Sequence, residues 1–338
     1  MFKAESGSAR FSSATATNAA PGQPSADRAN GRGSAPGDVG FVGLGRMGTA
    51  MAKNLATAGH RVIAYVRRPQ QMGTLLALGL KPTTDLADVF DCEIVITMLP
   101  DDAAVRDVAL GREEIKGLTA GLAPGAIHLS MSTISTAAAS QLAAAHARCG
   151  QGYVAAPVFG NPDAAKARQL FVVAAGAPAD VERCRPLLDQ LGQETFVVGT
   201  DPTHASLMKL MGNMLTATAL EMLGETAALL RKRGLDPGRF VKLMTSTMFG
   251  GRVHRIYGNR IAAQDYAAGF AVPLALKDVR LALAEAESAA VPMPSVSVVR
   301  DRLITGIARG YADLDWTALG LIAAEEAGLR VAHPVALN

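Results

Sequence analysis

Short apolar runs alternate with helical patterns over the first part of this chain. The first run, residues 39–44, leads into a helix that we expect to continue to about residue 58. Short, fully apolar runs separated by helices are typical of parallel strands that are buried on both faces. The other expected strands are residues 61–66, 93–99, 126–130 and 170–175. The alternation therefore predicts a mostly parallel, doubly wound α/β sheet.

This alternation ends near Gly199. Asp201-Pro202-Thr203 is typical of a helix start, because proline is tolerated in the first turn. Apolar residues then recur at helical spacing to about Lys232, which predicts one long helix from residue 202 to 232. Helical patterns continue to about residue 329 without a convincing strand. We therefore expect an N-terminal α/β domain, residues 39–200, and an all-α C-terminal domain, residues 201–330, which begins with the long helix.

The first 38 residues have a different composition. They are rich in Ala, Ser, Gly, Pro and Asn, and Phe2 and Phe11 are their only bulky apolar side chains after Met1. Such a segment buries too little apolar area to offset the entropy lost on ordering, so we expect residues 1–38 to be a disordered tail. A transit peptide is the alternative, and Glu5 and Asp27 argue against it.

Composition narrows the classes of protein. Of the 338 residues, 49% are hydrophobic and 19% charged, enough to build a sizeable core. A net charge of +3 gives no indication of nucleic-acid binding, and no segment is suited to span a membrane. The three cysteines lie far apart without metal-ligand spacing, so we expect free thiols, no bound metal and a cytoplasmic location. They are Cys92, Cys149 and Cys184.

The first apolar run ends in the pattern G-x-G-x-x-G, and a helix follows it directly. In this context the first glycine permits a tight turn, the second lets the backbone approach a pyrophosphate, and the third packs the helix on its strand. The N–H groups at the helix start then attract phosphate. The pattern predicts a dinucleotide-binding Rossmann domain. The expected cofactor contacts are Gly43, Leu44, Gly45, Arg46, Met47 and Gly48.

The end of the second strand bears on which dinucleotide binds. A carboxylate there would hydrogen-bond the ribose 2′-hydroxyl of NAD. This chain instead has Arg67 and Arg68, and guanidinium groups are well suited to a 2′-phosphate. We therefore expect NADP(H) rather than NAD(H), with a solvated basic turn as the alternative.

One candidate for acid–base chemistry lies in the first turns of the long helix. Lys209 and Asn213 are four residues apart and share a helix face. Apolar neighbours of Lys209 would desolvate its ammonium and lower its pKa, which makes the lysine a usable proton donor or acceptor. Judged from spacing alone, the alternative is a surface lysine whose ammonium reaches solvent.

Six blocks, in order, resemble the β-hydroxyacid dehydrogenase family, which includes 3-hydroxyisobutyrate dehydrogenase and glyoxylate/succinic semialdehyde reductases. The resemblance covers roughly residues 39–330. The blocks are G-F-V-G-L-G-R-M-G from Gly40, M-L-P-D from Met98, S-T-I-S from Ser132, A-P-V-F-G from Ala156, K-L-M-G-N from Lys209 and L-K-D-V from Leu276.

The resemblance implies an NADP-dependent oxidoreductase in which Lys209 is the general acid/base for hydride transfer between the nicotinamide and a small carbonyl or hydroxy acid. Asn213, Ser132, Phe159 and Gly160 would line the substrate site. Leu99, Pro100, Thr133 and Lys277 would contact the cofactor. Without the resemblance, Ser132 and Thr133 could equally cap the helix that follows, and Lys277 could belong to an exposed ion pair.

The substrate loop departs from the family pattern. Members that act on small hydroxy acids usually carry S-G-G there, whereas this chain has Phe159-Gly160-Asn161. The loop also resembles that of imine reductases, although those enzymes commonly have Asp or Tyr where this chain has Lys209. Imine reduction and a non-catalytic NADP-binding role therefore stay as alternatives. We also expect a homodimer or homotetramer that assembles through the helical region.

Overall fold

The computed structural model describes residues 37–330. The expected tail, residues 1–38, lies outside the described residues except for Gly37 and Asp38. Within the described range no helix is long and apolar enough to cross a membrane.

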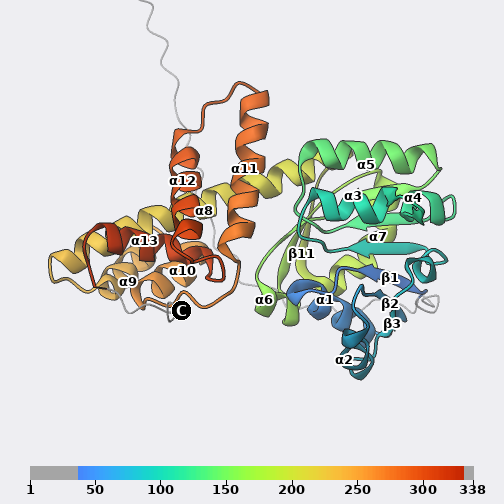
Figure 1. Cartoon of the computed structure of the whole chain (residues 1–338), viewed down its shortest axis with the longest axis horizontal. Helices are drawn as coiled ribbons and strands as arrows, with labels where there is room; N and C mark the ends of the chain where they lie inside the picture. Colours follow the sequence, from blue (N-terminus) through green and yellow to red (C-terminus); the bar gives the residue numbers. More distant parts are fainter. Residues whose placement is uncertain (1–36, 331–338) are drawn as a thin grey trace, which may run out of the picture. The chain divides into compact units, whose positions relative to one another are not determined.

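A single large sheet forms the first half of the described chain (Figure 1). Its order is β11-β10-β8-β7-β4-β1-β2-β3, and β9 pairs with β10. All neighbours from β3 to β8 are parallel, β10 is antiparallel to β8, and β11 is parallel to β10. The prediction of a mostly parallel sheet is confirmed. The strands are β1 (Val39–Val42), β2 (Val62–Tyr65), β3 (Lys81–Thr83), β4 (Ile94–Thr97), β7 (Ile127–Ser130), β8 (Gly152–Ala155), β9 (Val158–Phe159), β10 (Leu170–Ala175) and β11 (Gly192–Gly199), with a separate hairpin of β5 (Gly111–Arg112) and β6 (Ile115–Lys116).

Helices cover both faces of this sheet. One apolar cluster joins the sheet to α1 (Arg46–Thr57), α2 (Met72–Ala77), α6 (Pro162–Lys166) and α7 (Pro178–Leu191). Two further clusters join the opposite face to α3 (Asp102–Leu110), α4 (Leu118–Gly121) and α5 (Thr136–Arg148). Strands β1 and β7 are buried throughout and β4 is buried except at Ile94, as is typical of short parallel strands between two helical layers. Two single 3₁₀ turns complete this half, η1 (Pro69–Gln71) and η2 (Leu86–Val89).

The long helix α8 (Pro202–Lys232) begins and ends where its sequence predicts. Asp201 caps it by accepting a hydrogen bond from the Thr203 N–H. Its first turns pack against α5, β8 and β10, and its later turns carry the core of the helical half. There Gly224 lets it approach Gly320 closely, since a Cβ at residue 224 would lie 2.8 Å from the Gly320 Cα. The remaining elements are α9 (Pro237–Thr247), α10 (Arg252–Ala262), α11 (Val272–Ser288), α12 (Pro294–Ala308), η3 (Trp316–Ala318) and α13 (Leu319–Glu326).

A chain of buried polar side chains links β4 and β7 to α5. The Gln151 amide donates to the carbonyls of Thr119 and Leu122, so its oxygen accepts from His146 Nδ1 at 2.7 Å. His146 Nε2 then accepts from His128 Nδ1, and His128 Nε2 accepts from the Thr97 hydroxyl, both at 2.9 Å. In this arrangement both imidazoles are neutral, and each carries its proton on Nδ1. Burial lowers the pKa of both histidines, which is consistent with this arrangement.

Candidate active site

The expected cofactor and substrate residues collect at one edge of the sheet. Gly43 follows β1, Leu99 follows β4 and Ser132 follows β7, and these strands are adjacent and parallel. The carboxyl ends of parallel neighbours meet at the same edge, which is where ligands bind in open α/β sheets. The chain passes from β1 to neighbours on both sides, β2 and β4, so this edge lies at a topological switch point.

The glycine-rich turn has the shape that its spacing predicts. Gly43 has φ +101°, and a Cβ there would lie 2.3 Å from the Met98 carbonyl oxygen. At Gly48 a Cβ would lie 1.9 Å from the Gly43 oxygen. Gly45 is exposed, and no side chain caps the start of α1. A closely approachable turn and an uncapped helix start fit a dinucleotide pyrophosphate.

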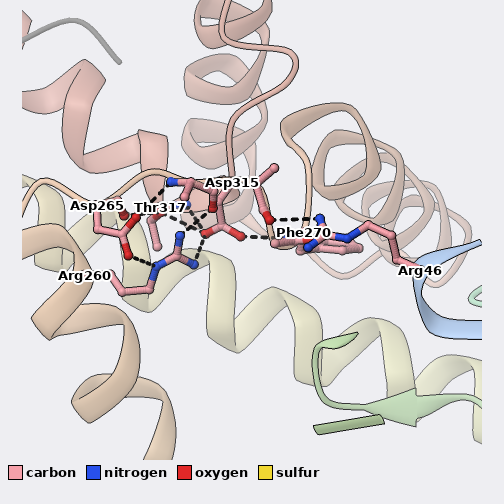
Figure 2. A network of polar contacts seen from close by, with 9 residues as sticks. Arg46, Arg260, Asp265, Phe270, Asp315 and Thr317 are labelled. Atoms are coloured by element: carbon pink, nitrogen blue, oxygen red, sulfur yellow. Dashed lines mark hydrogen bonds and ion pairs between the residues drawn. The ribbon is translucent and has the colours of Figure 1, made fainter. Parts of the chain in front are cut away.

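The three other residues of this turn have different surroundings. Leu44 and Met47 are half-buried and pack on the core. Arg46 is exposed and donates a hydrogen bond to the carbonyl oxygen of Ala268 at 2.9 Å (Figure 2). Ala268 belongs to the segment that precedes α11. Arg46 therefore ties the glycine-rich turn to the helical half of the chain.

The segment that Arg46 contacts is itself fixed by a buried carboxylate. Asp315 is 1% exposed and accepts from the Phe270 N–H at 2.7 Å and from the Thr317 hydroxyl at 2.8 Å (Figure 2). Arg260 forms an ion pair with the same carboxylate at 3.1 Å and a second one with Asp265. These contacts hold residues 265–270 in one conformation beside the glycine-rich turn.

Arg67 and Arg68 lie just beyond β2 and are both exposed. Because β1 and β2 are paired in parallel, with Val42 opposite Tyr65, both arginines lie at the same edge as the glycine-rich turn.

Ser132 makes a structural contact between two loops, which its sequence context did not predict. Its hydroxyl accepts from the Leu99 N–H at 2.8 Å and lies 3.4 Å from the Thr97 carbonyl oxygen. The side chain is buried and joins the loops after β4 and β7. The alternative that Ser132 or Thr133 caps the next helix is wrong, since Ser135 accepts the capping hydrogen bond from the Ala138 N–H.

Lys209 and Asn213 share one face of α8, as their spacing predicts. Lys209 Nζ donates to Asn213 Oδ1 at 2.9 Å, and each residue is 7% exposed. Asn213 Nδ2 donates to Asp278 of α11 at 2.5 Å. Lys277 pairs with the other oxygen of Asp278 at 2.8 Å and donates to the Thr133 carbonyl oxygen. A continuous polar chain therefore runs from Lys209 to the loop after β7.

Burial lowers the pKa of Lys209 from its usual 10.5 to about 8. The Asp278 carboxylate opposes this shift, and the positive charge of Lys277 adds to it. The ammonium and the free amine of Lys209 are therefore both accessible near neutral pH, which general acid–base chemistry requires.

Phe159 lies beside this lysine. Lys209 Nζ is 4.3 Å from the centroid of the Phe159 ring, a cation–π contact. Gly160 follows with φ +143°, and a Cβ there would lie 2.6 Å from Leu170 Cδ2. Asn161 caps α6 through the Ala164 N–H.

Asp278 was not among the site residues expected from the sequence. Its only signal was its place in the L-K-D-V block, in which Lys277 alone received a role. Among residues 37–330 no group of three or more His, Cys, Asp and Glu side chains is placed to hold a metal ion.

Two family models match the chain. Residues 38–199 match the NAD binding domain of 6-phosphogluconate dehydrogenase. Residues 204–322 match the NAD-binding family of NADP-dependent 3-hydroxyisobutyrate dehydrogenase. Together with the sheet and its glycine-rich turn, these matches define an NAD(P)-dependent oxidoreductase.

Individual proteins that are similar to this chain are also oxidoreductases. The uncharacterized oxidoreductase YfjR of Bacillus subtilis is 39% identical over 83% of this chain and 98% of its own length. The 2-hydroxy-3-oxopropionate reductase of Escherichia coli is 30% identical over 83% of this chain and 95% of its own. The crystal structure of 3-hydroxyisobutyrate dehydrogenase from Salmonella typhimurium has a TM-score of 0.75 and 25% identity, and covers 84% of this chain and 99% of that one. The chain belongs to the β-hydroxyacid dehydrogenase family.

Proposed function

We propose that this protein is an NADPH-dependent reductase of a small carbonyl compound, a semialdehyde or a 2-oxo acid, which also oxidises the corresponding hydroxy acid. The observation that carries the proposal is the buried Lys209, which the polar chain through Asn213, Asp278 and Lys277 joins to Thr133 in the loop after β7. The similarity to a 2-hydroxy-3-oxopropionate reductase supports this substrate class.

A nicotinamide held at this site would provide the hydride that the carbonyl carbon takes up. Lys209 gives a proton from its ammonium to the carbonyl oxygen as negative charge develops there, and is left as the free amine. Solvent then restores its proton. In the oxidative direction the free amine of Lys209 removes the hydroxyl proton. Asn213 holds the amino group in place from one side.

NADP(H) is the proposed cofactor. Support comes from Arg67 and Arg68, which are exposed beyond β2 where a ribose 2′-phosphate would lie. Leu99, Pro100, Thr133 and Lys277 complete the proposed cofactor contacts, and Ser132, Phe159 and Gly160 line the substrate side with Asn213. Replacing Arg67 and Arg68 together by Gln should raise the KM for NADPH tenfold or more and leave that for NADH within about twofold.

The enzyme acts, we further propose, as a homodimer or homotetramer in the cytoplasm. Four apolar side chains of α8 recur every seven residues and are exposed, and they form one stripe along the helix. The stripe is Met208, Leu215, Met222 and Leu229. The three cysteines, all free, suit a reducing compartment. Leu215→Glu should shift sedimentation toward the monomer, whereas Leu76→Glu, at an exposed leucine of α2, should not. A monomeric wild type would contradict the proposal.

The catalytic proposal is tested by NADPH oxidation with a panel of semialdehydes, 2-oxo acids and cyclic imines. Carbonyl reduction should fall about 10²–10⁴-fold in Lys209→Ala. Reduction needs the ammonium of Lys209 and oxidation needs its free amine. As the pH is raised through the Lys209 pKa of about 8, the rate of reduction should therefore decline and the rate of oxidation should rise. Imine turnover that survives Lys209→Ala would instead support an imine reductase. Tight NADPH binding without any turnover would indicate a non-catalytic protein.

A further inference from the structure

Phe159 and Gly212 fit together beside Lys209. Gly212 lies one residue before Asn213 on α8, and a Cβ there would lie 2.3 Å from Cζ of the Phe159 ring. The ring therefore rests directly on the helix at Gly212, where any other residue would displace it. Phe159 is in turn anchored in β9, where it pairs with Phe171 of β10. The ring is thus fixed from the sheet and from the helix.

The same ring covers one side of the Lys209 ammonium, at 4.3 Å from Nζ to the centroid. An ammonium carries three N–H donors. Asn213 Oδ1 accepts one of them at 2.9 Å, and the face of the Phe159 ring attracts a second.

We propose that Phe159 is a positioning residue that acts through Lys209: with Asn213 it occupies two of the three N–H bonds of the ammonium and directs the third toward the substrate oxygen. Gly212 is part of this device because it makes room for the ring. The proposal rests on the proposed function of Lys209 and assigns to Phe159 a role beyond lining the substrate site.

The ring also stabilises the charged form of Lys209. The charged groups that face the ammonium are Asp278 and Lys277 of α11, which act in opposite directions. A cation–π contact favours the ammonium over the free amine, so its loss lowers the pKa of Lys209. For a partly desolvated contact the expected change is about half to one pH unit.

The test follows the Lys209 Nζ–Cε group by NMR in protein labelled with ¹³C,¹⁵N-lysine, with the signal assigned by its loss in Lys209→Met. Phe159→Leu keeps apolar cover but removes the ring, and should lower the titration midpoint by the stated half to one unit. Phe159→Tyr should keep the wild-type midpoint. Phe90→Leu, at a phenylalanine whose ring lies on Gly121 of α4, is the matched control and should leave the midpoint unchanged.

Gly212→Ala provides the second, independent perturbation. It should displace the ring and lower the midpoint as Phe159→Leu does, but should add nothing in the Phe159→Leu background, because the same contact is already lost. In turnover assays both single variants should lower kcat for reduction more than they raise KM.

Coincident midpoints for wild type, Phe159→Leu and Gly212→Ala would overturn the inference even if Lys209→Ala abolishes turnover. If the titration midpoint of Lys209 shifts in these variants but Lys209→Ala leaves turnover unchanged, the contact between Phe159 and Lys209 is supported and the proposed function is overturned instead. The NMR titration does not depend on turnover, so the two failures are distinguishable.

Discussion

Asn213 Nδ2 lies 2.5 Å from a carboxylate oxygen of Asp278, and this contact decides which way the Asn213 amide faces. A carboxylate only accepts hydrogen bonds, so the NH₂ group must point to Asp278 and the amide oxygen to Lys209. Two helices, α8 and α11, therefore share the task of orienting one ammonium.

Replacing Asp278 by Asn should remove both this orientation and a favourable charge. Because the Asp278 carboxylate raises the pKa of Lys209, its loss should lower that pKa further, by about one unit. The pH at which reduction declines should move down by the same amount in steady-state profiles. Asp313→Asn, at an exposed aspartate, is the control and should keep the wild-type profile; an unmoved profile in Asp278→Asn would contradict the assigned coupling.

Lys209→Met should make the protein more stable at neutral pH while it removes activity. A lysine whose pKa is about 8 in the folded state and 10.5 when unfolded opposes folding at pH 7 by about 3 kcal/mol. The unfolded state binds more protons between these values, so the stability of the wild type rises with pH from about 8 to 10.5. Urea unfolding should show that the difference in unfolding free energy between variant and wild type is smaller at pH 10.5 than at pH 7. A constant difference would argue against the lowered pKa.

The buried histidine pair should make the protein sensitive to acid. Burial lowers the pKa of His128 well below 6.5, so below pH 6.5 the unfolded state binds more protons and stability falls as the pH falls. His128→Asn should make the fall in stability between pH 6.5 and 5 less steep, although it lowers stability at pH 7.5. His204→Asn, at an exposed histidine of α8, should leave the pH slope of the urea-unfolding free energy as it is. Equal slopes in wild type and His128→Asn would refute the prediction.

Two changes in the network of Figure 2 should differ sharply in their effect on stability. Asp315→Asn leaves the partly buried Arg260 without its buried partner and should cost about 3–5 kcal/mol. Arg46→Ala removes two exposed hydrogen bonds of the same guanidinium nitrogen, to the carbonyls of Ala268 at 2.9 Å and Gly269 at 3.5 Å, and should cost about 1 kcal/mol or less. Thermal unfolding of the two variants checks this, and equal losses would mean that the Arg46 contact is as important to the fold as the Asp315 cluster.

The sequence predicts some elements to the residue and misses others, for physical reasons. Strand β10 and helix α8 match their predicted bounds, because a short apolar run and a capped start with Pro202 are strong local signals. Strand β11 was missed because it lies at the sheet edge and is half-exposed without clear alternation. Its place depends on backbone hydrogen bonds to β10, which side-chain patterning does not encode.

Within the site, too, only contacts between residues close in sequence could be predicted. Lys209 and Asn213 could be paired from sequence because four residues bring side chains to one helix face. Asp278 lies 65 residues further along the chain from Asn213, and only the packing of α11 on α8 brings it there. Contacts of this range depend on tertiary structure rather than on local spacing.

The fit of Phe159 on Gly212 also constrains how this enzyme can be changed, by evolution or in the laboratory. A larger residue at 212 must displace the ring while the ring is present, whereas a small residue at 159 leaves room for it. Substitutions that reshape the site should therefore be tolerated better in one order: residue 159 first, then residue 212. Libraries that randomise either position alone would miss the variants in which both have changed.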